Sequence, residues 1–327
     1  MLTLAQLEQE GDKVADLYAE LQQQMFLMMI DATDKQRDLL QDRKNVALWR
    51  LRCLANMRAL TADVVKAVAQ TPHVAFSKLQ QLIQDNGMQV ADDINSELTT
   101  LLNKHVDISS SVRAIISSYL HQTFMDLNNN VNQTLLSTNY HDNAALQCYQ
   151  DIINKTVLES ETGLKTPQQA LRDNIYQWGM NGIKTSLIDK GGHRWSLEGY
   201  TRTVLNTTVH RVYNDVRMQS MKDFGSTLAV MSSHAAARPA CAPIQGQVIN
   251  IVPPSADGFN DKYDSIYNHG YGTPAGTLGI NCKHILFPYL DGVTHNYQKQ
   301  YDPDTAVKNA AIVAKQRQLE RGKRNGC

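Results

Sequence analysis

Two short segments hold the side chains best suited to chemistry. The first, SSHAAARPACAPIQG, carries His234, Arg238 and Cys241. The second, GTLGINCKHILFPYL, carries Cys282 and His284, and on a strand this spacing of two points both side chains to one face. Two thiols and two imidazoles make a tetrahedral ligand set of the kind that Zn²⁺ favours. The signal is weak, because structural zinc sites usually contain two tight ligand pairs and only one is present here.

Two other interpretations stay open. The segments could be buried structure, with the arginine bonded to loop carbonyls. Alternatively, Cys241 could be a nucleophile with His234 or His284 as its base and Asn281 or Gln245 as the orienting group. Nothing around Cys241 matches a catalytic signature. A zinc deaminase is disfavoured, because AAA follows His234 where that chemistry needs a glutamate.

The elements around these segments predict a small sheet. From about residue 226 helical periodicity stops, and STLAVMSS, GQVINIV and KHILFPYL are short runs rich in strand-forming residues between turn residues. A long loop rich in Gly, Tyr and Asp separates the second run from the third. The segments SSHAAARPACAPIQG and GTLGINCKHILFPYL both flank strands of this sheet. We therefore expect their side chains to lie close together in space, namely those of His234, Arg238, Cys241, Cys282 and His284.

The chain before residue 226 is expected to be mainly helical, with apolar residues recurring at spacings of three and four. Thr166 can cap a helix that has Pro167 at its first position, and the Gly-rich DKGGHRW then forms a turn. Ser196 can cap the next helix, which Gly225 ends. The regions expected to form the other long helices are residues 34–59, 76–102 and 110–136. The fold class is therefore α+β.

The helix after Ser196 has a polar face that carries Arg202, Asn206 and His210. Such faces are usually solvated, and a partner contact or a buried network are the alternatives. The expected division of the chain is an extended helical region (1–160), a helical connector (161–225), a small α+β domain (226–295), and a C-terminal helix with a basic tail (296–327).

Composition narrows the function classes. The chain has 327 residues, and Lys plus Arg equal Asp plus Glu at 32 each, so no global field points to nucleic acid or membrane. Five scattered cysteines do not form a disulfide framework, which favours a reducing compartment. The N-terminus does not read as a signal peptide, and MFLMMI is far too short to span a bilayer, so we expect no membrane anchor.

Three motifs in this order, GYTRTVLNTTVHRVYND, SSHAAARPACAPIQGQV and GTLGINCKHILFPY, resemble the minor capsid 2 family of tailed-phage proteins, which is similar in these motifs to Mu F-like head-morphogenesis proteins. The resemblance is specific over roughly residues 160–292. Cys241 departs from the pattern, in which a histidine is expected; a cysteine keeps a zinc ligand but changes a general base. The matching positions are Arg202, Thr203 and Asn206 in the first motif, His234, Arg238, Pro239 and Gly246 in the second, and Gly279, Asn281, Cys282 and His284 in the third.

The resemblance implies a few-copy structural protein of the virion, bound near the portal inside the head, that assists assembly or DNA delivery. Its implied partners are the portal protein and the major capsid or scaffold protein, and it implies no particular enzymatic activity. The alternative is a phage-borne effector enzyme that uses Cys241 with a histidine. Zinc is the one cofactor that the residues suggest.

The C-terminal end concentrates positive charge in an otherwise neutral chain. Arg321, Lys323 and Arg324 are the last of six basic residues that follow Val307, against one acid, Glu320. A solvated helix end whose cations suit the helix dipole is one interpretation. Contact with packaged DNA, or with an acidic surface of the portal or scaffold, is the other.

Overall fold

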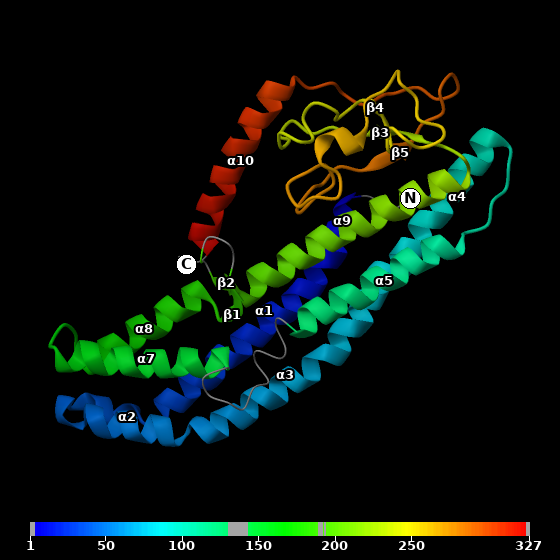
Figure 1. Ribbon diagram of the computed structural model, residues 1–327. Helices are drawn as coiled ribbons and strands as arrows, with labels where there is room; N and C mark the ends of the chain where they lie inside the picture. Colours follow the sequence, from blue (N-terminus) through cyan, green and yellow to red (C-terminus); the bar gives the residue numbers. More distant parts are fainter. Residues whose placement is uncertain (1–3, 130–142, 189–191, 193, 325–327) are drawn as a thin grey trace. The chain divides into compact units, whose positions relative to one another are not determined.

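The structure is a computed structural model that describes residues 4–129, 143–188, 192 and 194–324. Helices dominate the chain up to residue 223, and a small sheet follows, so the expected α+β class is confirmed (Figure 1). The helices are α1 (Leu4–Asp34), η1 (Arg37–Gln41), η2 (Arg43–Asn45), α2 (Val46–Ala55), α3 (Met57–Leu79), η3 (Gln80–Asp85), α4 (Asn86–Leu102), α5 (Ser110–Leu127), α7 (Ala144–Glu161), α8 (Pro167–Asn181), α9 (Leu197–Asp223), η5 (Ile266–His269) and α10 (Pro303–Arg324).

The chain forms two compact units, each built from separated segments. Unit 1 comprises Met1–Gly11, Leu79–Thr123 and Thr203–Cys327, and unit 2 comprises Asp12–Lys78 and Phe124–Arg202. The domain limits expected at residues 160, 225 and 295 stay predictions.

The three predicted strands are confirmed in unit 1 as β3 (Leu228–Met231), β4 (Val248–Asn250) and β5 (Leu286–Pro288). They form an antiparallel sheet in the order β4-β3-β5, in which Ala229 is paired with Ile249 on one side and with Pro288 on the other. All four residues of the central strand β3 are buried. The core around the sheet also takes in apolar residues of α4 and α9.

The predicted helix ends are confirmed where the structure describes them. The Thr166 hydroxyl accepts a 3.3 Å hydrogen bond from the backbone N–H of Gln169, and Pro167 begins α8. Ser196 accepts in the same way from Gly199 at the start of α9. Beyond α9, Gly225 has a φ of +81°, the left-handed conformation that glycine adopts without strain at a helix end.

Residues 34–59 do not form one helix as expected. Two short 3₁₀ helices, η1 and η2, precede α2. Between them Asp42 is extended (φ −116°, ψ 125°), and its carboxylate accepts from the backbone N–H of Lys44. Aspartate favours such a local turn, and here the turn interrupts the helical apolar pattern.

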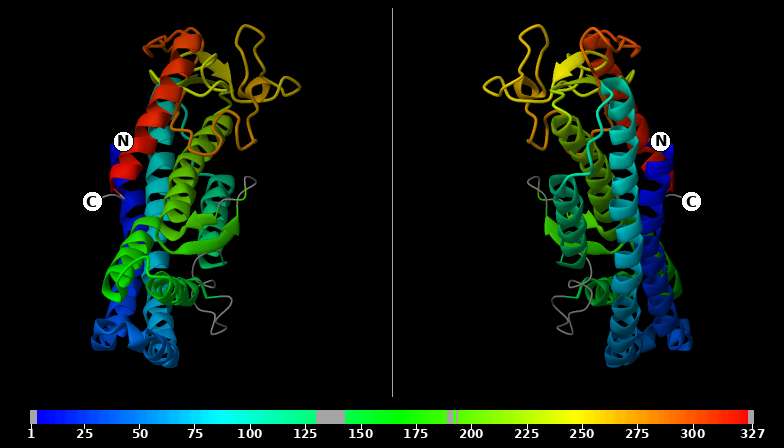
Figure 2. Two further views of the ribbon diagram at one scale, coloured as in Figure 1. Left: turned by 90° about the vertical axis from the view of Figure 1, so that its left-hand side faces the viewer. Right: turned by 90° about the vertical axis from the view of Figure 1, so that its right-hand side faces the viewer.

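A second antiparallel pair in unit 2 was not expected. β1 (Lys184–Ile188) and β2 (Arg194–Ser196) run side by side as neighbouring arrows in Figure 2, with Ile188 opposite Arg194. The predicted turn DKGGHRW joins them, and most of it lies outside the described residues. The short strands on either side gave no alternating pattern from which to predict them.

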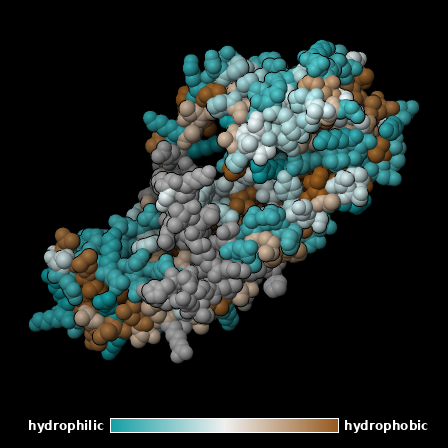
Figure 3. All heavy atoms as spheres, viewed as in Figure 1, coloured by the Kyte–Doolittle hydropathy of each residue, from teal (hydrophilic) through white to brown (hydrophobic). Residues whose placement is uncertain are grey.

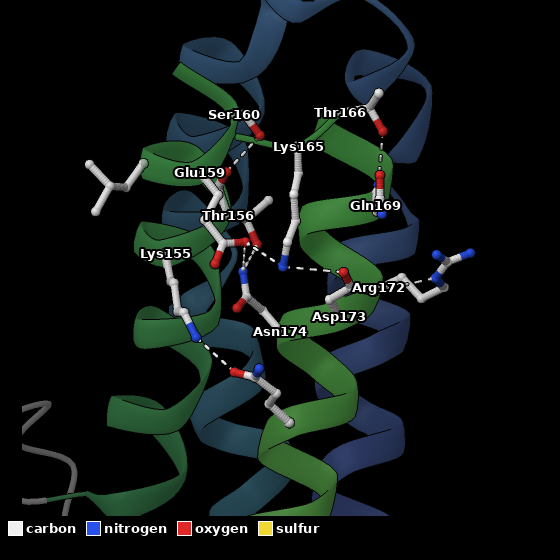
Figure 4. A network of polar contacts seen from close by, with 12 residues as sticks. Lys155, Thr156, Glu159, Ser160, Lys165, Thr166, Gln169, Arg172, Asp173 and Asn174 are labelled. Carbon is white, nitrogen blue, oxygen red and sulfur yellow. Dashed lines mark hydrogen bonds and ion pairs between the residues drawn. The ribbon is translucent and has the colours of Figure 1, made fainter. Parts of the chain in front are cut away.

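In unit 2, α7 and α8 are joined through polar side chains (Figure 4). The buried amide of Asn174 donates to the Thr156 hydroxyl and to the carboxylate of Glu159, both at 3.3 Å. Lys165 forms ion pairs with Glu159 at 3.4 Å and with Asp173 at 3.2 Å. These contacts fix the two helices as a hairpin.

Candidate functional site

The segment with His234 and Cys241 and the segment with Cys282 and His284 adjoin neighbouring strands of the sheet in unit 1. The first follows β3, and the second leads into β5. Beyond the paired strands, the backbone N–H of Ser232 donates to the carbonyl of Ile285 at 2.8 Å, and the Ser232 hydroxyl accepts from the N–H of Ile285 at 2.9 Å. The sheet register therefore sets one segment against the other, as expected from the sequence.

Three of the expected ligands converge. The Sγ atoms of Cys241 and Cys282 are 3.7 Å apart, and Cys282 Sγ is 3.3 Å from Nδ1 of His284. The three candidate ligand atoms all lie within 4.8 Å of one another. All three residues are buried, with Cys241 fully inaccessible. A buried group of two thiols and one imidazole can bind a soft or borderline metal ion.

Gln245 sets the tautomer of His284. Its Oε1 accepts a 2.9 Å hydrogen bond from the backbone N–H of His234, which can only donate, so this atom is the oxygen of the amide. The same oxygen lies 3.1 Å from Nε2 of His284, and that nitrogen must therefore carry the proton. In the neutral ring the lone pair is then on Nδ1, the atom that faces Cys282.

His234 lies beside this group but not within it. Its ring centroid is 4.6 Å from that of His284, and its Nε2 lies 3.3 Å from the carbonyl of Lys283. Because a carbonyl only accepts, Nε2 carries the proton and Nδ1 the lone pair. Burial lowers the pKa of His234, and the neighbouring His284 lowers it further. A neutral imidazole suits metal binding.

Arg238 bonds loop carbonyls, one of the roles considered from the sequence. Its guanidinium donates to the carbonyl of Pro274 at 3.5 Å and to that of Ile280. The same loop contains two residues of the third motif. A Cβ at Gly279 would lie 2.5 Å from the Pro274 carbonyl, and Asn281 has a φ of +56°. These residues shape the loop that delivers Cys282, while Pro239 is exposed.

The two thiols differ in acidity. The hydrogen bond between them raises the pKa of Cys241 and lowers that of Cys282, and His284 lowers the Cys282 value further. Cys282 is thus the member of the pair that becomes a thiolate more readily. Both thiols are buried.

Two polar residues of α9 hold the strand that follows His284, and the sequence did not reveal their role. The buried Asn214 amide donates to the carbonyl of His284 at 2.8 Å and accepts from the N–H of Leu286 at 3.0 Å. Arg217 donates to the carbonyl of Leu286 at 3.3 Å. A polar residue inside a helix gives no sequence signal that separates such a buried clamp from a solvated side chain.

The motif residues of α9 do not join the cysteine group. Arg202 belongs to unit 2, where it pairs with Asp12 at 2.8 Å and with Asp16 and Glu198 at 2.9 Å. Thr203 and Asn206 are half-buried in unit 1. The expectation of a solvated polar face is wrong for His210, which is 5% exposed, because that part of α9 is packed into unit 1.

The basic tail continues α10, whose last described residue is Arg324. The side chains of Arg321, Lys323 and Arg324 lie outside the described part of the structure, as does Cys327. Earlier in the helix, Lys308, Lys315 and Arg317 are exposed.

Residues 2–326 match the family described as phage minor capsid protein 2. The chain therefore belongs to this family, as its motifs predicted. It is 52% identical over 310 residues to a protein named "Structural protein" of Lactococcus phage LL-H, and the alignment covers 94% of this chain and 84% of that relative. A "Structural protein" of Lactococcus phage mv4 is 60% identical over 63 residues, which cover 19% of this chain and 51% of that relative.

No solved structure matches the chain. Among the described helices, none is both long enough and apolar enough to cross a bilayer.

Proposed function

We propose that the chain is a few-copy structural protein of the phage head, bound near the portal inside the shell, where it assists head assembly or DNA delivery. Membership of the minor capsid protein 2 family and the names of the two relatives support a place in the virion. The exposed face of α10 is the observation that supports a contact with another protein of the virion.

The start of α10 is anchored in unit 1. Ala306 is buried, and its carbonyl accepts from the N–H of Ala237 at 3.1 Å. Asn309 donates to the carbonyl of Ala235 at 2.9 Å. The helix is therefore held by its first two turns.

The later turns of α10 present apolar side chains. Ile312 is 66% exposed and Leu319 is 62% exposed, and their spacing of seven places them on one face. Lys315 lies between them and is exposed. On the face drawn in Figure 3, apolar groups stand among hydrophilic ones along this helix. An apolar stripe beside cations fits an apolar groove with an acidic rim on a partner protein. We propose that this partner is the portal protein.

The burial of the two thiols supports a structural role rather than an enzymatic one. A cysteine nucleophile needs both an ionised thiol and access to substrate. Cys241 has a raised pKa and no exposed surface, and Cys282 is only 4% exposed. An effector enzyme built on Cys241 would have to open this core before each reaction.

A binding assay tests the proposal. The purified chain is immobilised and offered the portal, major capsid and scaffold proteins of the same phage, each purified separately. We expect the portal protein to be retained, and the double variant Ile312→Asp and Leu319→Asp to lose it. Leu158→Asp, at a 61% exposed leucine of α7 in unit 2, is the matched control and should bind normally. Failure to retain the portal protein, or equal retention by all three chains, contradicts the proposal.

A further inference from the structure

The core of unit 1 contains two cysteines that packing alone does not explain. A buried free cysteine usually acts as a small apolar side chain. Cys53 in unit 2 fits that description, because burial raises the pKa of its thiol to about 11. Cys241 and Cys282 instead meet each other and the lone-pair nitrogen of His284. Three donor atoms of the kind that metals bind therefore point toward one place.

We propose that Cys241, Cys282 and His284 bind one Zn²⁺ ion, with His234 as the fourth ligand. The site is structural: it joins the segment after β3 to the segment before β5 from within the core. This inference is independent of the proposed place in the phage head.

The distances suit a tetrahedral ion. Zinc–sulfur bonds of about 2.3 Å and zinc–nitrogen bonds of about 2.0 Å place two sulfurs ~3.8 Å apart and sulfur ~3.5 Å from nitrogen. The sulfurs of Cys241 and Cys282 are 3.7 Å apart, and Cys282 Sγ lies 3.3 Å from His284 Nδ1. The three residues thus need only small adjustments to enclose the ion.

The surroundings of His284 are those of a metal ligand. A ligating histidine almost always donates its second ring N–H to an oxygen, which fixes the tautomer and the ring orientation. Gln245 provides that oxygen for His284, and the carbonyl of Lys283 does so for His234. Both imidazoles therefore offer Nδ1. His234, whose ring centroid lies 4.6 Å from that of His284, completes the site by a shift of its side chain that brings Nδ1 toward the three other ligand atoms.

A bound ion would stabilise the turn-rich part of unit 1. The sheet of unit 1 has three strands of three or four residues, and most of the chain around it is turns. A metal ion can stabilise such a turn-rich part of a fold by joining segments that have little regular structure. The proposed ion lies at the crossing of the two segments, close to where Arg238 also bonds the second one.

Metal content and spectroscopy test the site on the full-length chain. The chain produced with added zinc should retain about one zinc per molecule after exhaustive dialysis. Cobalt substitution should give the intense visible absorption of a tetrahedral thiolate site. Cys282→Ser should lose both signals, whereas Cys53→Ser, which removes a buried thiol from unit 2, should keep both.

Two weaker variants guard against misfolding as the explanation. Gln245→Ala leaves the three ligand residues in place but removes the oxygen that orients His284, which is also the acceptor of the His234 backbone N–H, and should lower zinc affinity about 10- to 100-fold. His234→Ala should fold and bind zinc more weakly than the unmodified chain. For the unmodified chain, a chelator should lower the unfolding temperature, and added zinc should restore it.

Several results would overturn the proposal. One is a zinc content of the unmodified chain no higher than that of Cys282→Ser. Another is a disulfide between Cys241 and Cys282 that persists when reductant and zinc are added. Equal zinc affinity in His234→Ala and the unmodified chain would overturn the four-ligand site.

Discussion

Asn214 in α9 donates its side-chain amide proton to the backbone carbonyl of His284, 2.8 Å away. Its side-chain oxygen accepts from the N–H of Leu286 at 3.0 Å, so one buried residue satisfies two backbone groups at the start of β5. This clamp sets the position of the histidine before any ligand is present.

Replacing Asn214 with alanine should therefore destabilise the chain. The change leaves two buried backbone groups without their side-chain partner, and each such group costs ~1–3 kcal/mol. We expect the free energy of unfolding to fall by about 2–4 kcal/mol in urea titrations. Gln219→Ala is the control on the same helix, since the Gln219 amide bonds Asp223 one turn later, and it should change stability by less than ~0.5 kcal/mol. Equal effects of the two changes would show that the clamp contributes nothing.

Arg202 should contribute a salt-dependent stability to unit 2. It contacts three carboxylates, and its side chain is 32% exposed, so solvent screens part of the attraction. Arg202→Gln should cost roughly 1 kcal/mol in dilute buffer and much less in ~1 M salt. Arg172→Gln, at a 76% exposed arginine with one 3.6 Å contact, is the control and should have little effect. A loss that does not depend on salt would contradict the ion-pair explanation.

The stability of unit 1 should respond to pH through Asp215. Burial raises the pKa of this carboxyl, although the hydroxyls of Tyr119 and Tyr271 donate to it at 2.5 and 3.2 Å and lower it in part. The folded state then holds a proton that the unfolded state releases, so the contribution of Asp215 to stability is present below pH ~3.9 and is lost as pH rises through the folded pKa. The titratable groups that face it, among the described residues, are Tyr119, Tyr267, Tyr271, Arg211 and Lys222.

Asp215→Asn removes this titration. Urea unfolding of both chains between about pH 4 and 7 should show that the unmodified chain loses stability relative to the variant as pH rises. A stability difference that is constant over this range, or that changes in the opposite direction, would disprove the assignment.

Alanine substitutions at two glycines distinguish the cost of a left-handed backbone from the cost of a steric clash. Gly246 has a φ of +73°, and a Cβ there would lie 2.8 Å from the backbone oxygen of Lys299. Gly272 has a φ of +87° with nothing within 4 Å of a Cβ. Alanine at Gly272 should cost ~1–2 kcal/mol from the left-handed backbone alone. Alanine at Gly246 should cost clearly more in the same unfolding assay, and equal costs would show that the Lys299 contact relaxes freely.

The basic tail gives a test of DNA contact. Changing Arg321, Lys323 and Arg324 to glutamine should weaken binding to duplex DNA and reduce the slope of log affinity against log salt by about 0.9 for each lost phosphate contact. Titrations at several salt concentrations measure this slope. If the unmodified chain shows no salt-sensitive DNA binding, or if the triple variant has the same slope, the tail is a helix end or a protein contact.

Local patterns in the sequence predicted many of the secondary-structure elements. Contacts between residues far apart in the sequence could not be predicted in this way. The three strands of the sheet and the cap at Thr166 follow from residue types within a few positions. The approach of Cys241 to Cys282, which are 41 residues apart, was predicted because their segments flank strands of one sheet. The tautomer set by Gln245 and the clamp by Asn214 depend on atoms that meet only in the folded chain. The same is true of the ion pairs between Arg202 and α1, which lie 186 and 190 residues away in sequence.

Cross-linking mass spectrometry on intact, purified virions tests whether the chain contacts the portal protein inside the head. An amine-reactive cross-linker should join the exposed lysines of α10, Lys308 and Lys315, to the portal protein. The chain should also resist added protease until the heads are opened, because a protein inside the shell is shielded from protease. Absence of the chain from purified virions, or cross-links to tail proteins alone, would contradict the proposed position in the head.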